Sequence, residues 1–288
     1  MKPGSKCSIR SSLPSAPWLA VLVSFVSLSC AGSETGNGMK TRTKLPVSIQ
    51  MRLTAPGAAA ERLTLLDGDN TSFEISSAWV SVERIEFVLP SGDACDELPG
   101  DVQAYSAACT GKGDRVRIDG PWVVDLVSGD FEPPLVGIDV LDGTFDSIEM
   151  KLAPGSAGSA GIEKDDVLDG ATLDIAGVVA LGAGVSRPFG LTLKMTVQSR
   201  FVDGGAVMIG TDADTVQLSL DVSNWFTSLT LGNCIVADAV PSRDGVLRLE
   251  DAEKRACGDV SHAVRQALSL TGKAKVKNKH GDDSEQDD

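Results

Sequence analysis

Apolar and polar residues alternate along most of this chain with a period of two. The cleanest run places Phe189, Leu191, Leu193, Met195 and Val197 on one side of an extended chain. A helix has a period of 3.6 residues and would scatter these side chains around its axis, whereas a strand collects them on one face. The pattern therefore predicts strands that bury one side.

Similar runs recur at short spacing, separated by residues typical of turns. They cover residues 47–53, 62–66, 72–76, 77–89, 116–126, 144–152, 173–179 and 216–222. In the run 77–89 the apolar phase slips by one residue, and a β-bulge near Glu83 and Arg84 would absorb that slip. No helical pattern is interleaved, so we expect an all-β fold, an antiparallel β-sandwich with sheets packed face to face.

The last part of the chain has a different pattern. Asp259 can cap a short C-terminal helix in which Val260, Val264 and Leu268 share a face. The tail that follows holds lysines, then acidic residues, and very few apolar side chains, so we expect it to be disordered. The Gly-, Ser- and Ala-rich stretch 153–171 is a candidate linker or long loop.

The first thirty residues have the composition of a secretory signal, with three basic residues before an apolar run at 18–28. This run is shorter than the roughly 20 residues that span a bilayer. Ser29 and Cys30 follow the run directly, and the pattern is similar to a bacterial lipoprotein signal, in which the cysteine receives lipid and becomes the mature N-terminus. Ordinary cleavage beside Ser27 and Ser29 is the alternative. Both interpretations predict export.

These observations predict five segments along the chain. They are a signal peptide (1–29), a flexible linker from the lipid anchor (30–45), a β-sandwich domain (46–226), a C-terminal extension with a disulfide and a helix (227–271), and a disordered charged tail (272–288).

Four cysteines remain after the signal peptide and the anchor position. In an oxidising compartment the simplest pairing joins Cys95 to Cys109 and Cys234 to Cys257, because each pair brackets one loop-like segment. A zinc site is the rival interpretation, but structural zinc sites use cysteine pairs only two to four residues apart. The spacing here favours disulfides.

Four short segments resemble a family of bacterial secreted lipoproteins that carry a domain of unknown function. They are SAWVSV at 77–82, DLVSG at 125–129, GTFDSI at 143–148 and DVSNWF at 221–226. The resemblance covers residues 46–226 and implies a transthyretin-like or immunoglobulin-like sandwich exported to the envelope. It implies no reaction, because these motifs are structural.

Charge and composition exclude several functions. The chain has 40 acidic and 26 basic residues, a formal charge of −14, which argues against binding to nucleic acid. Only two histidines are present, and no G-x-S-x-G motif exposes a serine, so His262 beside Ser261 and His280 in the tail are interpreted as surface residues. We identify no catalytic residues and no phosphate-binding loop.

Acidic pairs in turns are weak candidates for calcium binding, because Ca²⁺ takes six to eight hard oxygen ligands. The candidates are Asp67 and Asp69, beside Asn70, and Asp212 and Asp214, with Asp165 and Asp166 as a further pair. None follows the order of an EF-hand loop, and each can equally serve a turn. We expect no other cofactor.

Tryptophans give a second weak indication of function. Trp79 and Trp122 lie within apolar strand segments and are expected in the core. For Trp225, core packing and a carbohydrate-stacking platform both remain open.

Two functional hypotheses follow. In the first, the protein is a non-enzymatic lipoprotein of the bacterial cell envelope, located in the outer membrane and held there by an N-terminal lipid. It acts as a surface, adhesion or binding module for an envelope protein or carbohydrate. In the second, it is a secreted carbohydrate-active hydrolase that uses paired carboxylates.

Overall fold

The computed structural model describes residues 44–54, 63–91, 108–109, 114–136, 138–159, 161–163 and 166–279. The signal peptide, Cys30 and most of the expected linker lie outside these residues. All described residues belong to one compact unit, which covers residues 40–288. The predicted sandwich domain and the C-terminal extension are therefore parts of one folded unit.

Most of this unit is β-structure, as the alternation predicted. The strands are β1 (Lys44–Thr54), β2 (Leu63–Leu66), β3 (Ser72–Val88), β4 (Ala108–Cys109), β5 (Arg115–Asp125), β6 (Phe131–Glu132), β7 (Ile138–Leu141), β8 (Gly143–Phe145), β9 (Ser147–Leu152), β10 (Leu173–Ala180), β11 (Ser186–Leu193), β12 (Val197–Val202), β13 (Val207–Ile209), β14 (Ala213–Asp221), β15 (Ser242–Arg243), β16 (Val246–Arg248) and β17 (Thr271–Asn278). The helices are α1 (Leu231–Val236), the 3-10 turn η2 (Leu249–Asp251), α2 (Lys254–Cys257) and α3 (Val260–Ser269).

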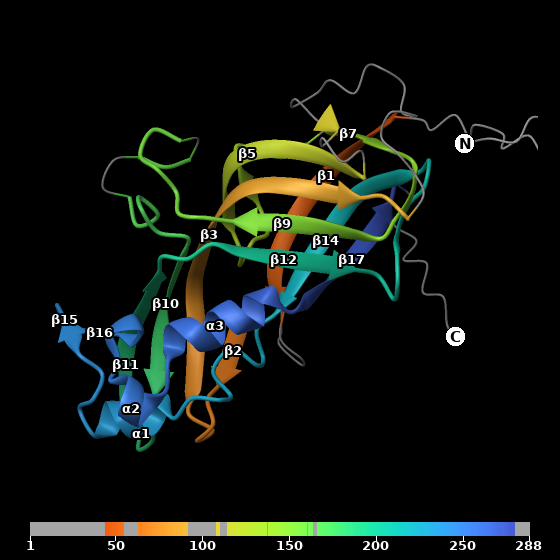
Figure 1. Cartoon of the computed structure of the whole chain (residues 1–288). Helices are drawn as coiled ribbons and strands as arrows, with labels where there is room; N and C mark the ends of the chain where they lie inside the picture. Colours follow the sequence, from red (N-terminus) through yellow and green to blue (C-terminus); the bar gives the residue numbers. More distant parts are fainter. Residues whose placement is uncertain are drawn as a thin grey trace, which may run out of the picture. The chain divides into compact units, whose positions relative to one another are not determined.

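One large sheet has the order β15-β16-β11-β10-β3-β9-β12-β17-β14-β1-β7, with β2 and β5 also paired to β3 (Figure 1). The sheet curves, and backbone N–H groups of β1 donate to carbonyls of the segment after β5: Leu53 to Leu126, Met51 to Gly129 and Ile49 to Leu135. These bonds join β1 to the far side of the curve. The apolar faces of the strands thus enclose a shared core.

Strand β3 is longer than any expected run and carries two bulges. The register slips between Val82 and Arg84 against both β5 and β9, which confirms the predicted bulge at Glu83. A second slip lies opposite Ala176 and Gly177 of β10. A Cβ on Gly177 would lie 2.1 Å from the carbonyl oxygen of Glu74, so only glycine fits there. Each bulge returns the apolar residues of β3 to the same buried face.

The sheet is mixed, which differs from the antiparallel arrangement that we expected. Three pairs are parallel: β1 with β14, β12 with β17, and β11 with β16. Parallel neighbours require a crossover connection, and α3 lies in the connection that leads to β17. Alternation within each segment indicates a strand but not the direction of its neighbour. The all-β part of the prediction holds, and the antiparallel sandwich is not confirmed.

The segment from residue 272, which we expected to be disordered, begins as strand β17. It lies between β12 and β14 in the sheet. Its inward positions are small, because a Cβ on Gly272 would lie 2.6 Å from the ring of Phe201, and Ala274 is buried. A few small side chains therefore suffice to fill this part of the core. The expectation of disorder was wrong here because it counted apolar residues without separating the two faces.

The stretch 153–171 is a folded loop rather than a linker. Ile162 and Leu168 are buried against Val123 and half-buried Trp79. The side chain of Asp169 accepts a hydrogen bond from the backbone N–H of Ala157 at 3.0 Å. Trp122 and Trp225 are fully buried, so the core interpretation holds for Trp122 and also decides the open case of Trp225.

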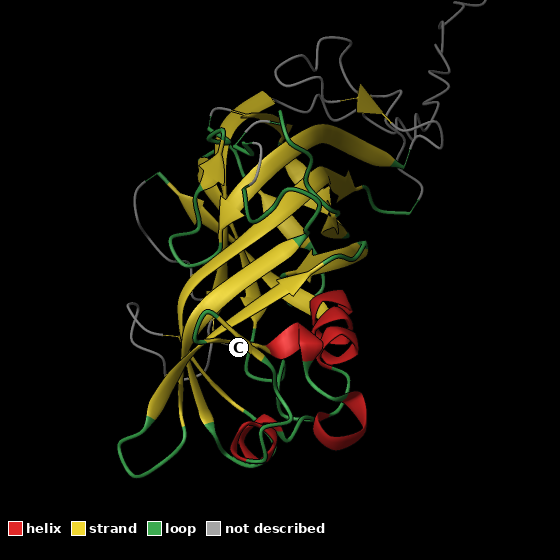
Figure 2. Cartoon of the chain, turned by 90° about the vertical axis from the view of Figure 1, so that its left-hand side faces the viewer, coloured by secondary structure: helices red, strands yellow, loops and turns green. Residues whose placement is uncertain are grey.

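The predicted C-terminal helix is present as α3. The side chain of its N-cap, Asp259, accepts a hydrogen bond from the backbone N–H of His262, and Val260, Val264 and Leu268 are buried. The hydroxyl of buried Ser199 on β12 donates to the carbonyl of Leu268 at 2.6 Å. Figure 2 shows the helices gathered at one end of the sheet. This end is where the chain passes from the last strands of the core into β17.

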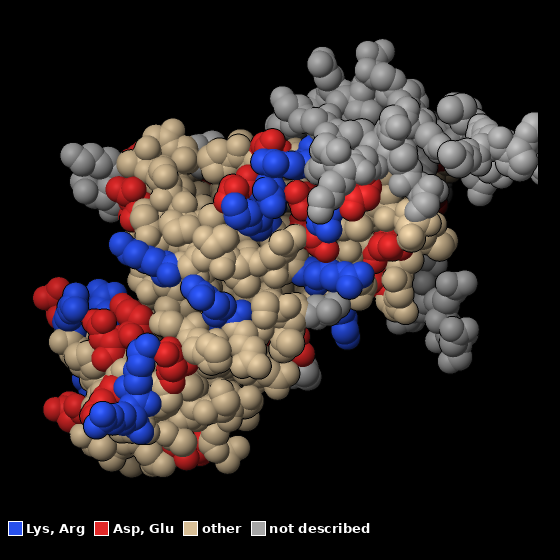
Figure 3. All heavy atoms as spheres, in the orientation of Figure 1, with Lys and Arg blue, Asp and Glu red and all other residues tan. Residues whose placement is uncertain are grey.

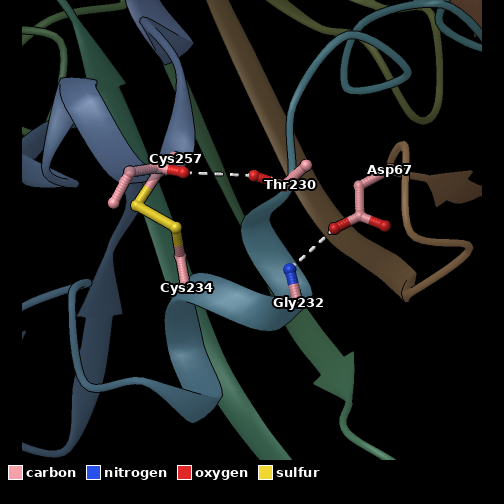
Figure 4. Close-up of a disulfide and its surroundings, with 6 residues drawn as sticks. Asp67, Thr230, Gly232, Cys234 and Cys257 are labelled. Atoms are coloured by element: carbon pink, nitrogen blue, oxygen red, sulfur yellow. Dashed lines mark hydrogen bonds between the residues drawn. A yellow bond between two sulfur atoms is a disulfide. The ribbon is translucent and has the colours of Figure 1, made fainter.

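Two links hold the helical segment in place (Figure 4). The predicted disulfide between Cys234 and Cys257 joins α1 to α2, with the two Cα atoms 5.6 Å apart. In addition, buried Asp67 in the β2–β3 turn accepts a hydrogen bond from the N–H of Gly232 at 2.7 Å. The same carboxylate accepts from the N–H groups of Asp69 and Thr71. Asp67 therefore fixes its own turn and ties that turn to α1.

Removing the Asp67 carboxylate should destabilise the fold. We expect Asp67→Ala to lower the free energy of unfolding by about 3 kcal/mol, because hydrogen bonds to charged groups contribute about 1.5–3 kcal/mol each and the N–H of Gly232 would lose its partner. The measurement is urea denaturation. Asp69→Ala is the matched control, since Asp69 is exposed in the same turn, and it should cost no more than about 0.5 kcal/mol. Equal losses in both variants would contradict the assigned role of Asp67.

Candidate functional site

A polar pocket of about 240 Å³ lies beside the N-terminus of α3. Its lining comes from three separate segments: the end of β11 and the residues after it, helix α2, and the first turns of α3. The lining residues are Leu193, Lys194, Met195, Lys254, Asp259, Ser261, His262 and Arg265. Three of these side chains are permanently basic and one is acidic. We call this hollow the α3 pocket.

The charges in the α3 pocket are unevenly paired. Lys254 forms an ion pair with Asp259 at 2.7 Å between Nζ and Oδ2. That lysine, together with the N–H of His262, lowers the pKa of the Asp259 carboxyl below its ordinary value. Lys194 and Arg265 are exposed and form no ion pair with any residue that the structure describes. The N-terminus of α3 adds a partial positive charge. The pocket therefore favours an anion.

Ser261, His262 and Asp259 meet in this pocket but do not form a hydrolytic triad. Such a triad needs the carboxylate to hold the histidine ring. Here one oxygen of Asp259 accepts from the backbone N–H of His262, and the other binds Lys254. His262 is exposed, as the sequence predicted. This arrangement is the capping of a helix.

A second polar cluster lies where β10, β11 and η2 meet. The hydroxyl of Thr192 donates to Asp174 at 2.7 Å, and the backbone N–H of Thr192 lies 3.4 Å from a carboxylate oxygen of Glu250. Strand pairing places Arg248 beside Gly190, two residues from Thr192 on the same strand. Two acidic side chains from distant parts of the sequence thus contact one threonine.

Both carboxyl groups of this cluster hold their protons more tightly than usual. Burial raises the pKa of Asp174, although the Thr192 hydroxyl and Arg248 act in the opposite direction. Burial also raises the pKa of Glu250, opposed by backbone hydrogen bonds and by Arg248. Paired carboxyls with raised pKa values occur at catalytic sites and also in structural networks. This pair is where the paired carboxylates of the hydrolase hypothesis would lie.

The calcium candidates are not brought together. Asp67 uses its carboxylate for three backbone N–H groups, and exposed Asp69 lies in the same turn. Asp212 is exposed in the turn before β14, and Asp214 is exposed within β14, where its carboxylate accepts from the hydroxyl of Thr215. Asp166 accepts from the N–H of Leu168, and Asp165 lies outside the described residues. Across the described part of the chain, no three His, Cys, Asp or Glu side chains are grouped to hold a metal ion.

Sequence reasoning did not identify Lys194, Arg265, Asp174 or Glu250 as site residues. No local motif marks them, because each site forms only when segments 58 or more residues apart become neighbours. Cys95 lies outside the described residues and nothing is described of the Cys109 side chain, so their disulfide stays a prediction. Within the described ranges, no helix combines the length and the apolar character needed to cross a membrane.

Comparison with known proteins assigns no family. No protein-family model matches the chain, and no curated protein matches it. Among solved structures, the chain is similar to MbnP from Methylosinus trichosporium, with 11% sequence identity and a TM-score of 0.33. That similarity covers 65% of this chain and 78% of the other.

The raised pKa values of Asp174 and Glu250 predict a pH effect on stability. A carboxyl with a raised pKa in the folded state makes the native protein bind more protons than the unfolded chain, so stability falls as pH rises through the ordinary carboxyl range and above it. We expect the double variant Asp174→Asn, Glu250→Gln to lose less stability than the wild type between about pH 4 and about pH 7. Both replacements keep an oxygen that accepts from Thr192.

Melting temperature measured across this pH range tests the prediction. Asp203→Asn, which neutralises an exposed carboxyl after β12, is the control and should retain the wild-type pH profile. A double variant with a profile parallel to the wild type would show that these two carboxyls do not titrate differently in the folded and unfolded states.

Proposed function

We propose that the protein is a non-enzymatic, lipid-anchored binding module of the bacterial cell envelope, and that its ligand carries a small anionic group. The signal pattern and Cys30 support the envelope part of this proposal. The charge of the α3 pocket supports the ligand part. The resemblance to secreted lipoproteins with a transthyretin-like or immunoglobulin-like sandwich belongs to the same proposal.

The single observation that carries the anion assignment is the excess of cations in the α3 pocket. Lys194 and Arg265 face an anion site without a carboxylate partner among the described residues, and the helix N-terminus offers N–H groups. A planar guanidinium such as that of Arg265 binds carboxylate, phosphate or sulfate through two hydrogen bonds. The volume of about 240 Å³ lies below the roughly 300–1,000 Å³ of pockets for drug-sized ligands. The ligand, or the part that enters, is therefore small.

Anion binding to the native state should raise the melting temperature. At a ligand concentration of 100 times Kd the gain is about 2.7 kcal/mol. We expect phosphate, sulfate or a small carboxylic acid to stabilise the wild type, and the double variant Lys194→Gln, Arg265→Gln to lose that response. Sulfate and phosphate also stabilise proteins generally by exclusion from the surface, so a control is needed.

The control is Arg187→Gln, Arg243→Gln, which removes two positive charges away from the pocket lining. It should retain the anion response. If both double variants respond to anions as the wild type does, the stabilisation is general and the pocket does not bind them.

Lipid attachment at Cys30 is tested separately. In cells given a fatty-acid probe, the wild type should be labelled and enter the detergent phase, and Cys30→Ser should do neither. An unlabelled wild type would contradict the anchor while leaving export by ordinary cleavage in place.

The alternative function is a hydrolase acting on carbohydrate, and the observation that favours it is the contact of Asp174 and Glu250 with one threonine. Glycoside hydrolysis needs one protonated and one ionised carboxyl group on either side of the bond. Release of reducing sugar from envelope polysaccharides would support this reading only if Asp174→Asn and Glu250→Gln each abolish it. Activity that survives both replacements would belong to another site or a contaminant.

A further inference from the structure

The outer face of the sheet carries a regular set of basic side chains. On β17, Lys273, Lys275 and Lys277 are exposed, while the residues between them face inward. Because alternate residues of a strand share a face, these three ammonium groups form a row with a repeat of about 7 Å. The strand lies inside the sheet, between β12 and β14, so the row runs across its middle and not along an edge.

The neighbouring strands add both basic and acidic side chains to this face. Arg200 of β12 is exposed and pairs in register with Thr271, and half-buried Arg52 of β1 lies two strands away, opposite Ser219. The residues directly opposite the three lysines are neutral: Val202, Ser219, Gln217 and Thr215. Acidic side chains flank the set, with Asp214 and Asp221 at exposed positions of β14 and Glu149 of β9 opposite Arg200. We name the set Arg52, Arg200, Lys273, Lys275 and Lys277 the basic sheet face. Figure 3 shows Lys and Arg side chains, with Asp and Glu side chains beside them, over the position of β12 and β17.

This face contrasts with the composition of the chain, in which 40 acidic residues outnumber 26 basic ones. The acidic residues closest to it in sequence lie where the strands end: Asp212 and Asp214 at one end, Asp203 and Asp221 at the other. Salt screens exposed charges beyond about 8 Å at physiological ionic strength. The electrostatic interaction of a surface that contacts the basic sheet face is therefore determined more by these lysines than by the net charge of the molecule.

The proposed anchor places this face near a membrane. Strand β1 begins at Lys44 and is one of the four strands of the face. Fourteen residues from Cys30 to Lys44 reach at most about 50 Å when fully extended. A lipid on Cys30 would thus hold the face at high effective concentration beside the bilayer that carries the anchor. This step rests on the proposed function.

We propose that the basic sheet face docks on the anionic phospholipid headgroups of the membrane to which the chain is anchored. Headgroup phosphates need only positive charge at the surface, and each Lys or Arg near an anionic membrane strengthens binding about five-fold. Single-stranded nucleic acids are instead held with aromatic stacking as well as positive charge. The described outward positions of these four strands hold no aromatic side chain. The observations therefore favour a lipid surface.

The test uses the unlipidated chain from Ala31, which contains the whole compact unit 40–288. Co-sedimentation with vesicles of phosphatidylglycerol and phosphatidylcholine should show binding that weakens steeply as salt is raised, and vesicles of phosphatidylcholine alone should show none. The triple variant Lys273→Gln, Lys275→Gln, Lys277→Gln should bind about 100-fold more weakly. Its melting temperature should stay close to that of the wild type, because the three side chains are exposed.

The matched control is Arg187→Gln, Arg243→Gln, Arg255→Gln, which removes the same charge from other elements and should bind vesicles as the wild type does. Equal weakening in both triple variants would assign the effect to net charge and overturn the proposal. So would an absence of binding to anionic vesicles, or binding to heparin in its place. None of these readouts depends on the α3 pocket, so this proposal and the anion proposal can fail independently.

Discussion

Strand β3 has 17 residues and is paired with other strands on both sides along most of its length, so it positions the strands around it. Its first half lies between β2 and β10, and its second half between β5 and β9. The alternation of apolar residues along β3 shifts by one residue at two places. In a strand without bulges, each shift would move the following apolar side chains to the opposite face, but the two bulges keep Phe73, Val80 and Phe87 on one buried face. On the outer face Glu86 is also nearly covered, and it is paired with Arg84 and Arg115.

The C-terminal segment completes the sheet, because β17 lies between β12 and β14 and pairs with both. Because β17 is the last strand, its place depends on the helices that precede it. The disulfide between Cys234 and Cys257 reduces the conformational entropy of the unfolded chain. In the chain-entropy account, closing a loop of this size stabilises the folded state by about 3 kcal/mol. Asp67 and Ser199 add contacts from the sheet to α1 and α3. The helical segment is therefore a structural part of the sheet rather than an appendix.

The sequence allowed the strands, the bulge at Glu83, the cap at Asp259 and the pairing of Cys234 with Cys257 to be predicted, because each depends on residues close together in the chain or on simple spacing. The parallel pairs could not be predicted, since strand neighbours such as β1 and β14 are more than 150 residues apart. The same limit hid the α3 pocket and the contact of Asp174 and Glu250 with Thr192. Asp67 was interpreted as a calcium candidate because turn-forming and calcium-binding aspartates have the same local composition.

The net charge of the sequence is a poor guide to the charges that the folded protein presents at each part of its surface. Read as composition, the chain is acidic and should avoid anionic partners. Folding separates the charges: carboxylates concentrate in turns and in pairs with arginine, while lysines two to six residues before the end of the described chain line up on one strand. Lys194 and Arg265 converge in the same way from segments about 70 residues apart. Exposed charges act over about 8 Å, so these local groups, and not the net charge of −14, determine which anions the protein can approach.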